Sequence, residues 1–152
     1  MGERESEREL RPPGAEEAAQ DITRDTKAFT AAIRTRLFTF LRGIVNGDCE
    51  QALASLTSLE GVEGEVWTAD RLRQTVEAYY VEHERICLDP NARNQRHTYV
   101  LPSEDKRHWA VQQVLIDPEE HNDWIAEFDI DLAQSREAKE PIVRLRAIRR
   151  IG

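Results

Sequence analysis

Two histidines and an aspartate in the C-terminal half carry side chains that could bind a metal or transfer protons. Imidazole nitrogens and carboxylate oxygens are the usual zinc ligands besides thiolates. His108 starts a predicted strand, His121 lies in a predicted loop, and Asp123 follows His121 by two positions. This spacing matches no zinc-binding motif. We therefore expect these histidines to be surface residues or hydrogen-bond partners of turns, and we expect no metal and no cofactor.

A row of acids, Glu127, Asp129 and Asp131, alternates along a predicted strand and brings its carboxylates to one face. Such a row could bind a divalent cation, but no glycine-bearing loop follows in the order of an EF-hand. Arg144 and Arg146 alternate in the same way on the next predicted strand. The sequence therefore predicts a ladder of ion pairs here.

Five polar and aromatic residues could converge where the third predicted helix meets the sheet: Tyr80, His83, Trp109, Gln113 and Trp124. Aromatic side chains with a few polar groups are typical of a ligand pocket. The same residue types also fill ordinary cores, where their polar atoms find partners. Both interpretations remain open from the sequence.

The sequence contains no complete catalytic motif. Phosphate-binding glycine loops, the nucleophile-elbow pattern and motif-spaced Cys–His pairs are all missing. Cys49 and Cys87 lie far apart without CxxC spacing, which is typical of free thiols in a reducing compartment. We therefore assign no catalytic residues and expect this chain by itself not to be an enzyme.

The net charge of -8 argues against simple electrostatic binding of nucleic acid, because phosphates require a basic surface. Once Arg144 and Arg146 are assigned to the acidic row, the basic residues left at the end of the last strand are Arg149 and Arg150. We take these two arginines as the candidates for contact with RNA or a partner.

Apolar residues recur at helical spacing in three stretches before residue 90. The first helix is predicted from Thr26 to Asn46-Gly47. Asp48 is expected to cap a short second helix, and Thr68 a third that runs through Ile86 and stops at Asp89-Pro90.

After Asn91 the apolar period changes from about 3.6 to 2, as in strands. Loops are expected at 117–122 and 133–140, and the predicted strands are His97–Leu101, His108–Ile116, Asp123–Leu132 and Ile142–Ile151.

Only one parity of pairing between the last two strands places apolar residues opposite each other. It puts Phe128 beside Leu145 and Ile130 beside Val143. The same parity sets Asp129 and Glu127 opposite the arginines of the last strand, on an outer face that also holds Ile125, Ile142 and Ile148. Because a slip of one residue would bury the carboxylates, this register class is the predicted one.

The order of elements predicts one α+β domain over residues 26–152, with about three N-terminal helices packed on a curved, cone-like antiparallel sheet of about four strands. Residues 1–25 are expected to form a flexible charged leader or linker, because they lack a continuous apolar stripe and contain Pro12-Pro13-Gly14. No signal peptide and no membrane-spanning run is found, which favours a cytoplasmic protein without membrane contact.

Four segments in order resemble an uncharacterised domain at the C-terminal end of bacterial DEAD/DEAH-box helicases. They are AFTAAIRTRLF (28–38), YYVEHERI with DPNAR (79–93), WAVQQVLIDPEEHNDW (109–124) and FDIDLAQS (128–135). The helices-then-strands order is also similar to the nuclear transport factor 2-like cone of ketosteroid isomerases.

The resemblance implies a non-catalytic accessory domain that contacts the helicase ATPase core in cis, RNA or a protein partner. The alternative is a free-standing cone-fold enzyme or small-molecule binder with a pocket between helices and sheet. A third interpretation is a homodimer formed through the outer sheet face, where Ile125, Ile142 and Ile148 were expected to be exposed.

Overall fold

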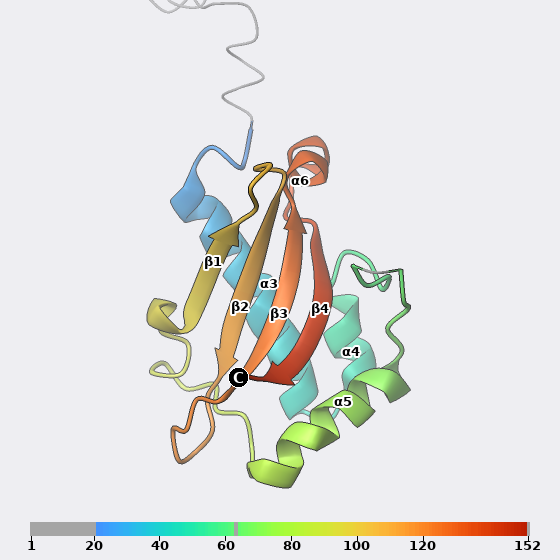
Figure 1. The fold of residues 1–152 in the computed structure, drawn as a ribbon, viewed down its shortest axis with the longest axis vertical. Coiled ribbons are helices and arrows are strands. Elements are labelled where there is room, and N and C mark those ends of the chain that lie inside the picture. Colours follow the sequence, from blue (N-terminus) through green and yellow to red (C-terminus); the bar gives the residue numbers. More distant parts are fainter. Residues whose placement is uncertain (1–20, 63, 152) are drawn as a thin grey trace, which may run out of the picture.

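The structure, a computed structural model that describes residues 21–62 and 64–151, packs helices against a four-stranded antiparallel open sheet (Figure 1). The α+β prediction is therefore confirmed. The elements are α3 (Thr26–Val45), α4 (Cys49–Ala54), α5 (Ala69–Glu82), the short helix η1 (Gln95–His97), β1 (Thr98–Pro102), β2 (His108–Leu115), β3 (Trp124–Asp131), α6 (Leu132–Ala138) and β4 (Val143–Arg150). The strand order is β1-β2-β3-β4. None of these helices is both long and apolar enough to cross a membrane.

Residues 1–20 of the predicted leader lie outside the described residues, whereas residues 21–25 are described. Ile22 packs against the hydrophobic core. Asp21 forms an ion pair with Arg136 at 3.2 Å, and the Arg136 guanidinium also donates a hydrogen bond to the Thr23 hydroxyl. The segment just before α3 is thus attached to the domain through α6.

The predicted helix starts are confirmed by their caps. The Asp25 carboxylate accepts the N–H of Ala28 at the start of α3. Asp48 and Thr68 cap α4 and α5 in the same way, as the sequence predicted. Each cap satisfies one of the N–H groups that a helix leaves without an internal partner.

The third helix ends earlier than the sequence predicted. α5 stops at Glu82, and His83 is already extended at φ -133 and ψ 143. Two contacts hold the following segment away from the helix axis: the Tyr79 hydroxyl donates to the carbonyl of Arg85, and the Cys87 N–H donates to the carbonyl of Ile116. Tertiary hydrogen bonds therefore override the local helical pattern.

A second correction concerns residues 133–140, which were predicted as a loop. Residues Leu132–Ala138 form α6, and the Asp131 carboxylate caps it by accepting the Gln134 N–H. An acid followed three positions later by Gln is a helix-start signal that the sequence already contained. Asp131 thus belongs to a helix cap and not to the predicted ladder of ion pairs.

The register of β3 and β4 is the predicted one at Phe128–Leu145, Asp129–Arg144 and Ile130–Val143. Between Phe128 and Glu127 the register shifts, and Glu127 pairs with Ala147 instead of Arg146. Arg146 is therefore the extra residue of a β-bulge, which changes the side of the sheet that later residues of β4 face.

The three isoleucines expected on an open outer face are all buried within the chain. After the bulge Ile148 pairs with Ala126 and joins the main core. Ile125 packs in a second cluster with Ala92 and Val114, and Ile142 is 8% exposed. These three isoleucines therefore do not form the exposed apolar face on which the homodimer interpretation depends.

The main core lies between α3 and the sheet, and two aromatic pairs join these layers. The Phe40 and Phe128 rings meet edge to face at 5.4 Å between centroids, and those of Phe29 and Trp109 at 5.3 Å. The loop between α4 and α5 covers the edge strand: the Trp67 indole N–H donates to the Leu145 carbonyl at 3.0 Å. This cover protects β4 from pairing with another chain.

Close contact between α3 and α4 depends on Gly43. A Cβ added there would lie 2.6 Å from the backbone nitrogen of Ala52 and 2.7 Å from its Cα. An alanine in a helix is ordinarily more stable than glycine by about 0.5–1 kcal/mol. We expect Gly43→Ala to lower the free energy of unfolding by about 1–3 kcal/mol instead, because the two helices must move apart.

Urea denaturation followed by circular dichroism measures this change. Thr39→Ala, on the exposed side of the same helix, is the control and should stay within about 0.5 kcal/mol of the wild type. A Gly43→Ala protein at least as stable as the wild type would contradict the close contact.

Candidate functional site

The five residues predicted to line a pocket do not share one site. His83 and Trp124 both pack against the buried ring of Tyr79, with centroids 5.1 and 5.7 Å away. Tyr80 also touches Tyr79 but is 38% exposed. Here aromatic residues form a packed cluster under the end of α5.

Trp109 and Gln113 lie elsewhere on the sheet. Trp109 packs on Phe29 of α3 and pairs with Ile130. Gln113 is buried, and its side-chain oxygen accepts a hydrogen bond from the Thr98 hydroxyl. Trp109 and Gln113 are therefore packing residues and not part of a shared pocket.

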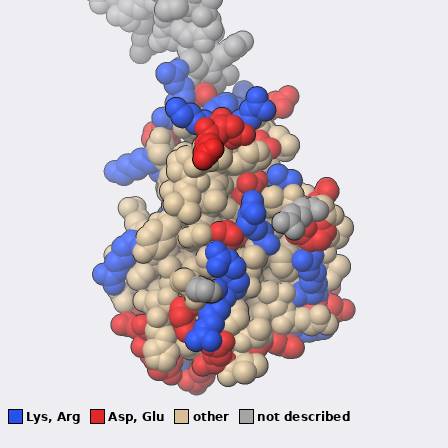
Figure 2. Space-filling view, viewed as in Figure 1, with Lys and Arg blue, Asp and Glu red and all other residues tan. Residues whose placement is uncertain are grey.

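Two members of the acidic row, Asp129 and Glu127, form ion pairs on the sheet face opposite α3. Asp129, whose side chain is only 8% exposed, contacts His108 at 3.1 Å and Arg144 at 3.3 Å. Glu127 lies 4.0 Å from Arg146 and accepts a hydrogen bond from Gln112. Figure 2 looks onto this face and shows both signs of charge interspersed along it.

The two arginines proposed for nucleic acid are also paired with carboxylates. Arg149 lies 3.8 Å from Glu127, while Arg150 lies 3.4 Å from Glu82 and 3.8 Å from Asp123. Such pairing lowers the positive potential that a phosphate would encounter at the end of β4.

A hollow of about 710 Å³ opens beside the ion pairs, between the β1–β2 turn and β4. Val62 and Leu101 contribute apolar surface, and the ionisable residues of the lining are Glu104, Asp105, His108, Asp129, Arg144 and Arg146. Because both signs of charge line it, this hollow favours no one class of ligand.

A groove of about 360 Å³ along α3 has a different character. Arg34, Phe38 and Arg42 recur four positions apart and so lie on one side of the helix. Arg93, from the segment after α5, completes the groove. Arg34 ties the two segments together, because its guanidinium donates to the carbonyl of Arg93 and, at 3.3 Å, to the Thr98 hydroxyl.

The electrostatics of this arginine groove are those of an anion site. No carboxylate lines it, and Arg34, Arg42 and Arg93 form no ion pair with any acid in residues 21–62 or 64–151. Partial burial, together with the nearby charge of Arg93, holds the pKa of Arg34 below its ordinary value. An arginine guanidinium nevertheless stays charged in a folded protein.

The other polar groups of the lining are already engaged within α3. The hydroxyls of Thr35 and Thr39 donate to backbone carbonyls one turn earlier. The Arg34 guanidinium stacks over the Phe38 ring at 5.2 Å, which holds it in position. A sequence signal existed for part of this groove in the spacing of Arg34 and Arg42; the position of Arg93 depends on the fold.

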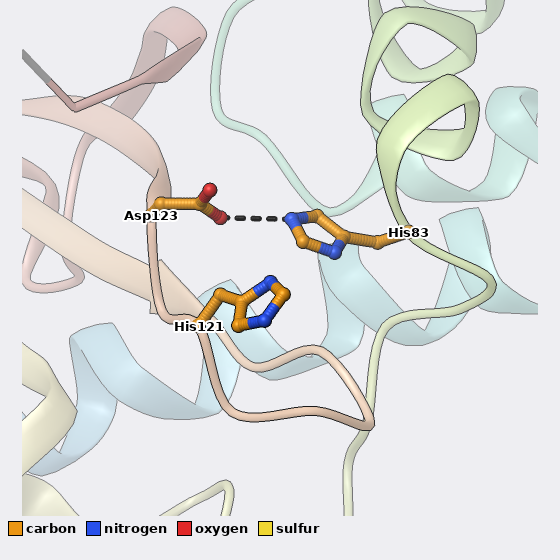
Figure 3. A group of neighbouring side chains, drawn as sticks. All are labelled: His83, His121 and Asp123. Atoms are coloured by element: carbon orange, nitrogen blue, oxygen red, sulfur yellow. Dashed lines mark hydrogen bonds and ion pairs between the residues drawn. The ribbon is translucent and has the colours of Figure 1, made fainter.

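The predicted grouping of His108, His121 and Asp123 is divided by the fold. His108 pairs with Asp129, whereas His121 and Asp123 lie beside His83 (Figure 3). Nε2 of His83 lies 2.8 Å from Oδ1 of Asp123. We call this group, with the buried Asp117, the His–Asp cluster.

Comparison with known proteins gives one result. The family described as "Domain of unknown function (DUF3516)" matches residues 1–148. The chain belongs to the DUF3516 family. No curated protein and no solved structure matches it.

The DUF3516 match covers all four segments on which the sequence resemblance was based. Those segments supply residues to both sites: Arg34 and Arg93 to the arginine groove, and His83 and Asp123 to the His–Asp cluster. Residues that are distant in the sequence of this DUF3516 domain thus meet at two places in the fold.

The ion pairs of the sheet differ in how strongly they should stabilise the domain. Arg144→Ala leaves the nearly buried carboxylate of Asp129 without its arginine partner, so we expect a loss of about 1.5–3 kcal/mol in unfolding free energy. Arg149→Ala removes an ion pair whose arginine is half exposed, and we expect it to lower the unfolding free energy by less than about 1 kcal/mol. Urea denaturation at neutral pH compares the two, and equal losses would contradict this ranking.

Proposed function

We propose that this DUF3516 domain is a non-catalytic C-terminal accessory domain of a cytoplasmic DEAD/DEAH-box helicase-like protein, and that it binds the phosphate backbone of single-stranded RNA through the arginine groove. The observation that carries the RNA contact is a groove with three arginines and no carboxylate in a chain of net charge -8. The resemblance of four ordered segments supports the helicase context.

Arginine suits this role because its planar guanidinium presents several N–H donors to phosphate oxygens. Contacts of this kind position a strand without reading its bases. We therefore expect binding that depends little on RNA sequence. The acids elsewhere on the domain repel the rest of the strand, so we expect weak, salt-sensitive binding that assists the helicase core in cis.

The packing between helices and sheet favours the accessory role over the alternative of a cone-fold enzyme. Where that alternative expects a pocket, Phe40 and Phe128 are in edge-to-face contact and Tyr79 packs on Trp124. The likeness to the nuclear transport factor 2-like cone remains a prediction from the order of elements.

Replacing two arginines of the groove tests the RNA contact. We expect Arg42→Gln/Arg93→Gln to weaken binding of a fluorescein-labelled mixed-sequence RNA oligonucleotide at least tenfold at low salt, measured by fluorescence anisotropy. Each lost phosphate contact should also reduce the slope of log affinity against log salt by about 0.7, hence by about 1.4 for two.

The control is Arg149→Gln/Arg150→Gln, which removes the same charge from arginines that have carboxylate partners. The control should bind RNA almost as the wild type does. If the control loses more RNA affinity than the groove variant, RNA binds at the end of β4 instead of in the groove. No measurable RNA binding by the wild type at low salt, or preference for a poly-glutamate peptide over RNA, would reject the RNA contact.

The helicase context has its own test, which does not depend on RNA binding. We expect the complete gene to encode the ATPase motifs of a superfamily-2 helicase before residue 1 of this chain. Sequencing the locus and its transcript decides the question, because an open reading frame that starts at Met1 without such motifs would reject that context.

A further inference from the structure

We propose that His83, His121 and Asp123 bind a divalent metal ion, with Zn²⁺ as the best fit, at the end of the domain where α5 meets the loop between β2 and β3. This metal site is independent of the proposed RNA contact. The sequence predicted no metal here, because His83 is far from the other two residues in the chain. The fold brings the three side chains together, and Figure 3 shows them pointing toward one another.

The distances suit a shared ion. One ligand atom from each of the three residues lies within 4.8 Å of the others. Two ligands of one Zn²⁺, each about 2.0–2.2 Å from it, can be no more than about 4.4 Å apart. A small rotation of the His121 side chain, which is 61% exposed, can bring its nitrogen within this limit.

The backbone explains why these side chains meet. Because α5 ends at Glu82, the extended His83 turns toward the loop after β2. In that loop Asn122 has a positive φ of 53°, a conformation that non-glycine residues seldom adopt. It lies between His121 and Asp123, and both side chains approach His83 from the same loop.

Asp117 supplies the feature that distinguishes this cluster from a chance group of surface charges. Its fully buried carboxylate lies 3.6 Å from His83 Nδ1, while His83 Nε2 lies 2.8 Å from Asp123. A carboxylate behind the far nitrogen of a metal-binding imidazole is the common way to orient that ligand. Asp117 is in turn held by the N–H groups of His121 and Asn122.

The charge around the three ligands suits a cation. The carboxylates of Asp117 and Asp123 lie 3.6 and 2.8 Å from the two ring nitrogens of His83. In Figure 2, acidic side chains gather at the end of the molecule where α5 and this loop lie, which favours cations.

The neighbouring charges set limits on the site. Arg150 lies 3.8 Å from Asp123 Oδ2, the oxygen that does not contact His83, and its side chain is 62% exposed, so it can move aside. Exposed Glu119 forms a second group with His83 and Asp117 and could supply a fourth ligand. Otherwise water takes the fourth position, as in zinc sites with three protein ligands.

Titration with the metal alone tests this proposal, using the chain without a histidine tag. Isothermal titration calorimetry with Zn²⁺ should show one ion per chain, and Co²⁺ should give a visible absorption band typical of tetrahedral coordination. We expect His121→Ala and Asp123→Asn each to weaken Zn²⁺ binding at least tenfold. His121 is exposed, so its replacement should leave the fold intact.

The control is His108→Ala, which removes a histidine that also faces a carboxylate but has no second histidine beside it. Its affinity for Zn²⁺ should equal that of the wild type. Binding that is absent in the wild type, or unchanged in His121→Ala and Asp123→Asn, would overturn the proposal. The contact of His83 with Asp123 would then be a hydrogen bond that only joins α5 to the loop.

Discussion

The alternation of side chains along β3 is the constraint on which the rest of the domain depends. This strand has neighbours on both sides, and its apolar residues other than Ile125 face α3 while Glu127 and Asp129 face the other way. Because side chains alternate strictly, neither face can change without exposing the core or burying carboxylates. The position of α3, the arginines of β4 and the contact between Phe40 and Phe128 all follow from that arrangement.

A second constraint lies at the end of α5, where the core and the His–Asp cluster meet. Tyr79 packs between His83 and Trp124 and donates its hydroxyl to the chain that leaves the helix. Tyr79 thus contacts both the segment where α5 ends and the His83 ring, which points toward the loop after β2. Stability and the proposed metal site share these contacts, so changes in the aromatic cluster should affect both.

The distribution of charge explains how an acidic domain can still present an anion site. On the sheet face opposite α3, arginines and acids neutralise one another in pairs. In the arginine groove, Arg34, Arg42 and Arg93 have no such partners among the described residues, whereas carboxylates gather at the end that carries the His–Asp cluster. The two proposed ligands have opposite charge, and the domain offers each a separate surface.

Much of the fold was readable in the sequence, because the signals are local. Helical spacing and the caps Asp48 and Thr68 gave the helix starts, and strict alternation gave the register at Phe128–Leu145. The cap signal of Asp131 with Gln134 is also present in the sequence, although the lack of an apolar stripe predicts a loop where α6 forms. Such features depend on hydrogen bonds and periodicity over a few neighbouring residues.

Other features were decided by tertiary structure alone. The early end of α5 and the bulge at Arg146 were not predicted from the sequence, and they bring His83 toward Asp123 and Ile148 into the core. Both proposed sites combine residues from separate segments: Arg93 with α3, and His83 with the loop after β2. The sequence determined the elements and the faces they bury, but only packing of the whole chain decided which polar groups meet, because such meetings depend on long-range distances that no local pattern encodes.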